Sequence, residues 1–265
     1  KALEEIDRAT QMISGYQSSL VSESLPFALR LHRADIYTQQ KNYSEAQNLL
    51  LNLQNEAEVH KQKAYLAYVL IALGVLSQEQ SQWDLAREYY ERALRVSKEY
   101  KLLGAEGRSQ GHLADTYLNE GNASYATYLL QEAIPKINTS GDMELSSYFV
   151  GRLGESLIIQ GKKGDGQNLI GRALRIAEQM EYRQYQIRWR SALAVEAMSD
   201  GLYEDARRLL TAVFAQMNTQ IFKDEPKMVN TLCRLCKVCL RLNDIPAALD
   251  YAKQASEFSG SVSSI

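Results

Sequence analysis

Three cysteines in one short segment are the residues whose spacing most suggests chemistry. Cys233, Cys236 and Cys239 follow one another at intervals of three residues, the C-x2-C-x2-C order of thiolates that hold an iron–sulfur cluster. Such a cluster takes four thiolates, and the sequence contains only 3 cysteines. Helical residues three apart also point in diverging directions, because each residue turns the helix by about 100°. We therefore predict that the cysteines are reduced, buried and free of metal.

The histidines and a glycine-rich segment give no stronger indication of catalysis. His32, His60 and His112 lack the i, i+4 spacing that places two metal ligands on one helix face. We expect His32 and His112 to pack against neighbours or to lie at the edge of a groove. Residues 161–166, Gly-Lys-Lys-Gly-Asp-Gly, lack the G-x4-G-K-[ST] order of a phosphate-binding loop, which favours a turn. Without a strand-to-helix elbow for a nucleophile, we predict that the chain is not an enzyme and uses no cofactor or metal.

A basic and aromatic segment leaves two interpretations open. Residues 182–190 interleave three arginines with Tyr182, Tyr185 and Trp189, a pattern that can bind RNA or a phosphopeptide. The alternative, which we favour, is a solvated helix with Trp189 packed inward. The whole chain has 30 Lys and Arg residues against 32 Asp and Glu, a formal net charge of −2. Because phosphate contacts need an excess of positive charge, we predict no direct nucleic-acid partner.

The composition indicates a helical chain with a large core. Apolar residues make up 45% of the 265 residues, which include only 4 prolines and 15 glycines, few breakers for that length. No apolar run reaches the roughly 18 residues that a membrane span requires, and the beginning has no signal-peptide pattern. An odd, clustered set of cysteines favours a reducing compartment. We expect an intracellular protein of the cytoplasm or nucleus, without a membrane partner.

The elements that position these residues follow from a repeat of forty residues. One small residue recurs at steps of 40, 40, 40, 40 and 42, at Ala34, Gly74, Ala114, Gly154, Ala194 and Cys236. A turn is expected after each, near 40–43, 80–83, 120–123, 160–163, 200–203 and 242–245. Gly121, Gly161, Gly201 and Asn243 suit the positive φ that such turns require. The helix after each turn has apolar residues at i, i+4 and i+7, so each repeat is two helices that bury their faces by stacking.

This repeat resembles the tetratricopeptide repeat (TPR). The resemblance is carried by Leu113, Ala114, Tyr117, Gly121, Ala126, Leu130 and Ala133. The period exceeds the usual 34 residues by about six, which is similar to the longer-period relatives: kinesin light chain, the LGN/Pins polarity adaptors, MalT-type sensor domains and helical scaffold subunits. Residues 44–100 are similar to the TPR region of anaphase-promoting complex subunit 5.

Two known TPR binding patterns are missing or weak in this sequence. The carboxylate clamp of chaperone-binding TPR proteins is absent, since the matching positions carry Leu31, Asp35, Ala72, Arg108 and His112. Only Asn119 fits the asparagine ladders of polarity adaptors and kinesin light chain.

The resemblance implies one all-α, right-handed α-solenoid of helix–turn–helix TPR-like repeats over residues 1–265. We place the second helix of a truncated preceding repeat at 1–20. The six repeats are expected at 26–60, 64–100, 105–138, 144–180, 184–220 and 226–258, followed by a frayed tail at 259–265.

In such an array the first helix of each repeat lines the concave surface, which the resemblance implies as the binding groove. The candidate groove residues are Asp35, Gln39, Gln78, Arg108, Asp115, Asn119, Tyr148, Arg152, Glu155, Arg188 and Lys237. Their mixed charge favours a protein or peptide over a phosphate backbone. We predict a protein-interaction scaffold or adaptor of a multi-protein complex; the alternative is a MalT-like regulatory domain that senses a ligand or peptide.

Overall fold

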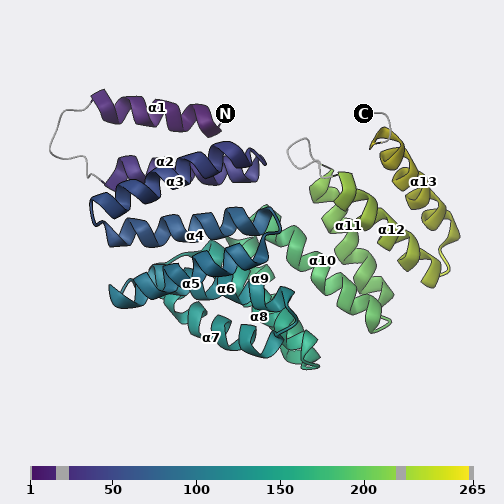
Figure 1. The fold of residues 1–265 in the computed structure, drawn as a ribbon. Helices are drawn as coiled ribbons and strands as arrows, with labels where there is room; N and C mark the ends of the chain where they lie inside the picture. The colour runs from purple at the N-terminus through teal and green to yellow at the C-terminus, as the bar shows by residue number, and fades with distance from the viewer. Residues whose placement is uncertain (1, 16–23, 219–224, 263–265) are drawn as a thin grey trace. The chain divides into compact units, whose positions relative to one another are not determined.

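The computed structural model describes residues 2–15, 24–218 and 225–262 (Figure 1). These residues form 13 α-helices and no strand, which confirms the predicted all-α class. In chain order the helices are α1 (Ala2–Gly15), α2 (Ser24–Gln39), α3 (Tyr43–Val59), α4 (Lys63–Glu79), α5 (Trp83–Glu99), α6 (Leu103–Asn119), α7 (Ala123–Ser140), α8 (Met143–Ile159), α9 (Lys163–Gln179), α10 (Arg183–Ser199), α11 (Tyr203–Met217), α12 (Glu225–Arg241) and α13 (Ile245–Val262).

The turns between the helices repeat one backbone motif. From α3 to α11, helices begin at a constant interval of half a repeat, at Tyr43, Lys63, Trp83, Leu103, Ala123, Met143, Lys163, Arg183 and Tyr203. After α3, the N–H of Gln62 donates to the carbonyl of Ala57 (2.8 Å) and the N–H of Lys61 to that of Glu58 (3.1 Å). These are the two hydrogen bonds of a Schellman motif, in which the residue after the helix takes a left-handed conformation.

The predicted turns are confirmed, including the positive φ at Gly121, Gly161, Gly201 and Asn243, which ranges from 59° to 82°. From α3 to α10 the turns that join one repeat to the next are equally short. There the left-handed residue is often not glycine: Lys61 and Lys101 have φ of 54° and 55°. From α3 to α11 the chain is therefore an even succession of helices, joined by short turns that each contain a left-handed residue.

The chain folds as two compact units, which meet in sequence at Asp142 and Met143. Unit 1 holds α1–α7 and unit 2 holds α8–α13. The sequence pattern runs through this point without interruption. The helix pairs α2–α3 through α12–α13 carry the six repeats, and we call their first members A helices and their second members B helices.

The terminal helices agree only partly with their predicted bounds. Helix α1 covers Ala2–Gly15, and the rest of the predicted 1–20 helix lies outside the described residues. Pro26 falls in the first turn of α2, where the missing N–H of proline is harmless. Helix α13 continues to Val262, so residues 259–262 of the predicted tail are helical, and 263–265 lie outside the described part.

The small residues of the repeat let paired helices approach closely. A Cβ on Gly154 of α8 would lie 2.7 Å from the carbonyl oxygen of Gly166 and 2.7 Å from Cγ1 of Ile170, both on α9. In unit 1 the ring of buried Tyr90 fills the place that a side chain on Gly74 would take. Glycine is required at these seams because packed interiors leave no room for an added methyl group.

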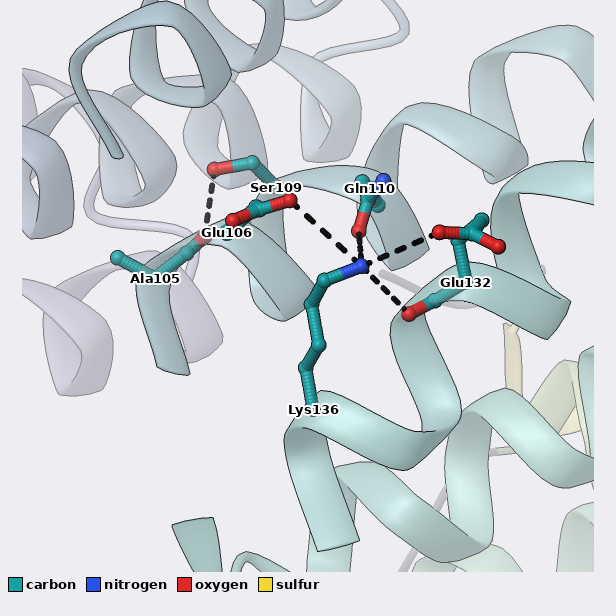
Figure 2. Close-up of polar contacts among 6 residues, drawn as sticks. All are labelled: Ala105, Glu106, Ser109, Gln110, Glu132 and Lys136. Carbon is teal, nitrogen blue, oxygen red and sulfur yellow. Dashed lines mark hydrogen bonds and ion pairs between the residues drawn. The ribbon is translucent and has the colours of Figure 1, made fainter. Parts of the chain in front are cut away.

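In some repeats a pair of polar side chains forms a hydrogen bond or ion pair between the two helices. Lys136 of α7 donates to Oε1 of Gln110 on α6 (3.0 Å) and to its own helix at the carbonyl of Glu132 (2.9 Å), and its Nζ lies 3.6 Å from Oε1 of Glu106 (Figure 2). Figure 2 also shows Ser109 donating to the carbonyl of Ala105 one turn back (2.8 Å). This polar cluster ties α6 to α7.

The same two positions alternate between polar and apolar residues along the chain. The polar pairs are Arg30–Glu56 at 2.6 Å, Gln110–Lys136 at 3.0 Å and Arg190–Gln216 at 2.7 Å, in the first, third and fifth repeats. The intervening repeats carry Leu70 and Val96, Val150 and Ile176, and Leu232 and Phe258. The fold thus has a longer period, a double repeat, that sets odd repeats apart from even ones.

Candidate functional site

Neighbouring A helices pack side by side throughout unit 1 and, in unit 2, at α8 and α10. In unit 1, α2 packs against α4 and α4 against α6; in unit 2, α8 packs against α10. We call the surface of α2, α4 and α6 the A-face of unit 1, and the surface of α8, α10 and α12 the A-face of unit 2. All the predicted groove residues lie on these A helices.

An arginine stacked on a tyrosine joins neighbouring A helices in both units. The guanidinium carbon of Arg108 on α6 lies 5.8 Å from the ring centre of Tyr68 on α4. In unit 2 the same carbon of Arg188 on α10 lies 5.3 Å from the ring centre of Tyr148 on α8. In sequence order, Tyr68, Arg108, Tyr148 and Arg188 follow one another at intervals of one repeat. We call each tyrosine with the arginine one repeat later a Tyr–Arg step, and this step recurs once in every double repeat. Cation–π contact holds each guanidinium in place.

Each step arginine is also held by a carboxylate. Arg188 donates to Oε2 of Glu155 (3.2 Å), and Arg152 donates to the same oxygen (2.5 Å). In unit 1, Arg108 donates to Oδ2 of Asp142 (2.5 Å). Two guanidinium groups therefore share one oxygen of Glu155. Since an arginine carries five N–H donors, Arg188, which is exposed, retains donors for a ligand.

The basic and aromatic segment at 182–190 packs as the favoured interpretation predicts, as a helix with Trp189 turned inward. Trp189 is buried, its Nε1 donates to Oγ of Ser147 (3.2 Å), and its ring occupies the space beside Gly151 on α8. Arg190 pairs with Glu178 at 2.7 Å. The predicted inward packing of Trp189 is confirmed, and the arginines do not alternate with exposed aromatic rings as stacked RNA bases would require.

The A-face of unit 1 holds two carboxylates in contrasting surroundings. Asp115 on α6 is only 3% exposed, so it is not the open groove residue that the sequence suggested. Asp35 on α2 has an exposed side chain, but the protein around it partly desolvates the carboxyl group and raises its pKa to about 6, against the opposing effects of His32 and Arg108. Burial lowers the pKa of His112 to about 4, which keeps its imidazole neutral at pH 7.

The remaining predicted groove residues differ in whether they contact other side chains or face solvent. Gln78 of α4 accepts a hydrogen bond from the hydroxyl of Tyr90 (3.1 Å), and that ring stacks on His112 at 5.5 Å. Three others, Gln39, Asn119 and Lys237, lie on their A helices and are exposed to solvent. Tyr68 was not among the predicted groove residues, and Tyr185, whose ring centre lies 5.6 Å from that of Tyr148, was predicted only as part of the basic and aromatic segment. Tyr68 occupies the position one double repeat before Tyr148, so the repeat itself could have identified it.

The prediction that all three cysteines are buried is wrong. Cys239 is buried, Cys236 is half-buried and Cys233 is exposed on α12. Residues three apart on a helix point about 60° apart. Cys233 is six residues before Cys239, so its side chain points about 120° away from that of Cys239 and faces solvent. Nowhere in the described residues do three or more His, Cys, Asp or Glu side chains gather closely enough to hold a metal ion.

Solved structures show which fold this chain shares. BtubC (BKLC) from P. vanneervenii matches with a TM-score of 0.67 at 15% identity, over 90% of this chain and 93% of that one. The apo quorum sensor NprR from B. thuringiensis matches with a TM-score of 0.67 at 14% identity, over 96% and 71%. TPR-like repeats of a Podosopora anserina kinesin light chain match with a TM-score of 0.57 at 16% identity, over 74% and 96%.

The chain has a TPR-like fold. Identities of 14–16% to these structures support the fold and nothing finer. No protein-family model and no curated protein sequence matches the chain. The similarity to anaphase-promoting complex subunit 5 stays a prediction.

The TPR-like repeats expose some apolar residues, but none of the described helices is long and apolar enough to cross a membrane. NprR has also been solved in complex with its cognate peptide NprX, and that structure matches this chain with a TM-score of 0.64.

Proposed function

We propose that this chain is a protein-interaction module that binds a segment of a partner protein on its A-faces and performs no catalysis. The observation that carries the proposal is the Tyr–Arg step, which stands at the same repeat position in each unit. The repeat position that carries Tyr68 and Arg108 carries Ala28 on α2. Packing of the helices therefore does not require an arginine at this position. A guanidinium held by a ring and a carboxylate is ordered in advance, which lowers the entropy cost of binding.

The chemistry of the A-faces suits a polypeptide. Arg188 offers N–H donors to carboxylates and carbonyl groups, and the rings of Tyr148 and Tyr185 offer apolar surface beside it. Glu155 and Asp35 supply the opposite charge. A phosphate backbone favours a surface of one positive sign, so we propose a protein or peptide partner within a multi-protein complex. The free cysteines fit a reducing compartment such as the cytoplasm or nucleus.

Site-specific photo-crosslinking tests the proposal. A photoreactive phenylalanine analogue at Val195, an exposed A-face position of α10, should capture a partner. The same analogue at Arg175, exposed on the B helix α9, should not. Arg188→Ala should weaken the captured complex by about 1–2 kcal/mol, as for an interface hot spot, while Arg175→Ala changes nothing. Arg152→Ala should weaken it similarly.

Equal capture from Val195 and Arg175 would contradict the A-face as the binding surface. Wild-type affinity in both Arg188→Ala and Arg152→Ala would do the same. Circular dichroism should show unchanged helix content in these variants, so that loss of binding is separate from loss of fold.

A second candidate function is a regulatory sensor that binds a peptide or ligand and controls an attached domain. It is favoured by the similarity in fold to NprR, which has been solved both in its apo form and with its peptide NprX. A sensor should change its hydrogen-exchange protection across a whole unit on ligand binding, whereas a scaffold should change it only at the contacts.

A further inference from the structure

The last helix pair of unit 2, α12 and α13 (Figure 1), exposes apolar residues at helical spacing. On each helix three of them form one stripe, because steps of three or four residues keep them on one side. We call these six residues the end face: Cys233, Cys236, Leu240, Ile245, Leu249 and Ala252. All except half-buried Cys236 are exposed, and Leu249 is 67% exposed. A continuous exposed apolar surface of this kind is typical of an interaction site.

The preceding repeat shows what covers the same positions elsewhere in unit 2. One repeat earlier, the positions of Cys236, Leu240, Ile245 and Ala252 carry Ala194, Met198, Tyr203 and Leu210. Those four residues join one core cluster with Leu235 and Val238 of α12, the next A helix. The position of Leu249 carries Arg207, which donates to Asp244 just after α12 (3.3 Å). In the fifth repeat these positions are therefore covered by an A helix.

The seam between α8 and α10 shows the same relation at the position of Cys233. Two repeats before Cys233 stands Gly151 of α8, where an added Cβ would collide with the ring of Trp189 on α10. Trp189 also donates from Nε1 to Oγ of Ser147 on α8 (3.2 Å). The next A helix thus places a large side chain against this position. Since Cys233 is exposed, no described helix stands at the corresponding place beside α12.

The charges closest to the end face are basic. Lys237 and Lys253 are exposed, and each lies within roughly 60° of the exposed leucine on its own helix. No ion pair of either lysine is seen in the described ranges. The exposed acids of α13, Asp250 and Glu257, lie about 100° and 80° around the helix from Leu249. A second copy docked about a two-fold axis would bring the same lysines together, so charge complementarity favours an occupant with acidic residues.

We propose that the end face binds an amphipathic α-helix of a partner protein, with an apolar stripe toward α12 and α13 and acidic residues on its flanks. The bound helix takes the place that an A helix has in the preceding repeats. Its apolar stripe follows the i, i+3 spacing by which Leu235 and Val238 of α12 enter the core cluster. The end face is a second interaction surface, and binding there does not depend on binding at the A-faces.

Disulfide tethering at Cys233 tests the proposal on the full chain, because it captures weak ligands at a chosen place. The protein carries Cys236→Ala, which leaves Cys233 as its exposed thiol and Cys239 buried. The probes are peptides that copy α12 with its own cysteines replaced by alanine. Thr231→Cys supplies the single peptide thiol, because Thr231 stands one repeat after Trp189 and should meet Cys233 as Trp189 meets Gly151.

Three peptides separate shape from charge. The solvent-facing residues are all glutamate in the acidic peptide and all lysine in the basic peptide. The scrambled peptide has the acidic composition without the apolar stripe. Each peptide thiol is capped as a disulfide with 2-mercaptoethanol, which leaves as a thiol when Cys233 forms the new disulfide. Intact mass spectrometry measures the captured fraction at a fixed concentration of 2-mercaptoethanol.

The acidic peptide should be captured about tenfold more than the scrambled peptide, since burial of two or three apolar side chains changes affinity by at least that factor. It should also be captured more than the basic peptide. Leu249→Glu should lower capture of the acidic peptide by about tenfold. Leu202→Glu is the matched control and should change nothing, because Leu202 is a leucine of unit 2 that is 55% exposed outside the end face. Circular dichroism checks that both variants keep their helix content.

Four results would overturn the proposal. Equal capture of the acidic and scrambled peptides, or unchanged capture by Leu249→Glu, would show that the end face is not a helix site. Capture of the basic peptide at or above the level of the acidic one would exclude the acidic partner. A dimer in sedimentation that Leu249→Glu dissolves would assign the face to a second copy. Leu249→Glu should leave capture of a partner from Val195 unchanged, so the end face and the proposed function can fail separately.

Discussion

Replacing Lys136 tests whether the polar cluster between α6 and α7 stabilises the fold or only sets the identity of its repeat. Lys136→Met keeps the length of the side chain and removes its charge. Lys136 is 18% exposed and Glu106 is 15% exposed, so both charges lie mostly out of water. The substitution leaves the carboxylate of Glu106 and the amide oxygen of Gln110 without their cation.

The expected cost follows from the three main contacts. Hydrogen bonds to a charged group contribute about 1.5–3 kcal/mol each, and breaking a fully buried ion pair costs about 3–5 kcal/mol. The Lys136–Glu106 separation of 3.6 Å and the remaining exposure reduce both. The fourth contact, with half-exposed Glu132 at 3.5 Å, adds little. We expect Lys136→Met to lower the free energy of unfolding by about 2–3 kcal/mol.

The double repeat suggests a triple variant that should restore the stability lost in Lys136→Met. Glu106→Leu, Gln110→Leu and Lys136→Val together install the residues that the second repeat has at Leu66, Leu70 and Val96. Replacing all members of a buried polar cluster by apolar residues is often neutral. We expect the triple variant to fall within about 1 kcal/mol of wild type, and so to be more stable than Lys136→Met alone.

Urea unfolding followed by circular dichroism measures both variants. Amide hydrogen exchange in α6 and α7 shows whether the loss is local, as expected for an array of repeats. If Lys136→Met matches wild type within about 0.5 kcal/mol, the cluster contributes nothing and this reasoning fails. If the triple variant is the less stable of the two, the polar cluster is needed for more than satisfying its own charges.

Three further outcomes are expected. Gly154→Ala should lower the melting temperature, and Gly154→Leu should prevent the native packing of unit 2, because the added Cβ lies 2.7 Å from the carbonyl oxygen of Gly166; normal stability of the alanine variant would contradict the close seam. The pKa of His112 is lowered to about 4 from 6.5, so the unfolded chain takes up its proton first and stability falls as pH drops from about 6.5 to about 4; His112→Phe should lose about 2–3 kcal/mol less over that range in urea titrations, and parallel pH profiles would refute this. Native protein should react with a thiol reagent quickly at exposed Cys233 and slowly at buried Cys239, as mass spectrometry can show; equal rates would contradict the assigned burial.

The repeat could be predicted from the sequence because its causes are local. A small residue at a seam, a left-handed residue after each helix and an apolar stripe at i, i+4 and i+7 each act within a few residues. Gly154 and Gly121 therefore stood in the expected places. The predicted bounds left only a few residues between repeats, but they did not identify the left-handed residues there, because Lys61 and Lys101 adopt positive φ without being glycine. A Schellman motif needs the conformation, and glycine only makes it less costly.

The candidate site could be predicted only as a set of positions. The forty-residue phase assigned Arg108, Tyr148 and Arg188 to A helices, and each lies there. Their partners come from other repeats, as when Arg188 meets Glu155 on the preceding A helix. Phase gives a residue its place along a helix, but which side chains meet depends on how adjacent helices pack.

Burial separates what the sequence determined from what the tertiary structure decided. The sequence by itself determined an all-α chain of helix pairs, since period and turn residues are properties of neighbouring positions. It did not determine that Asp115 is buried while Asp35, at the same repeat position, is exposed. Nor did it show the division into two units at Asp142. These depend on how many helices surround a given residue, which is a sum over distant parts of the chain and leaves no trace in local sequence.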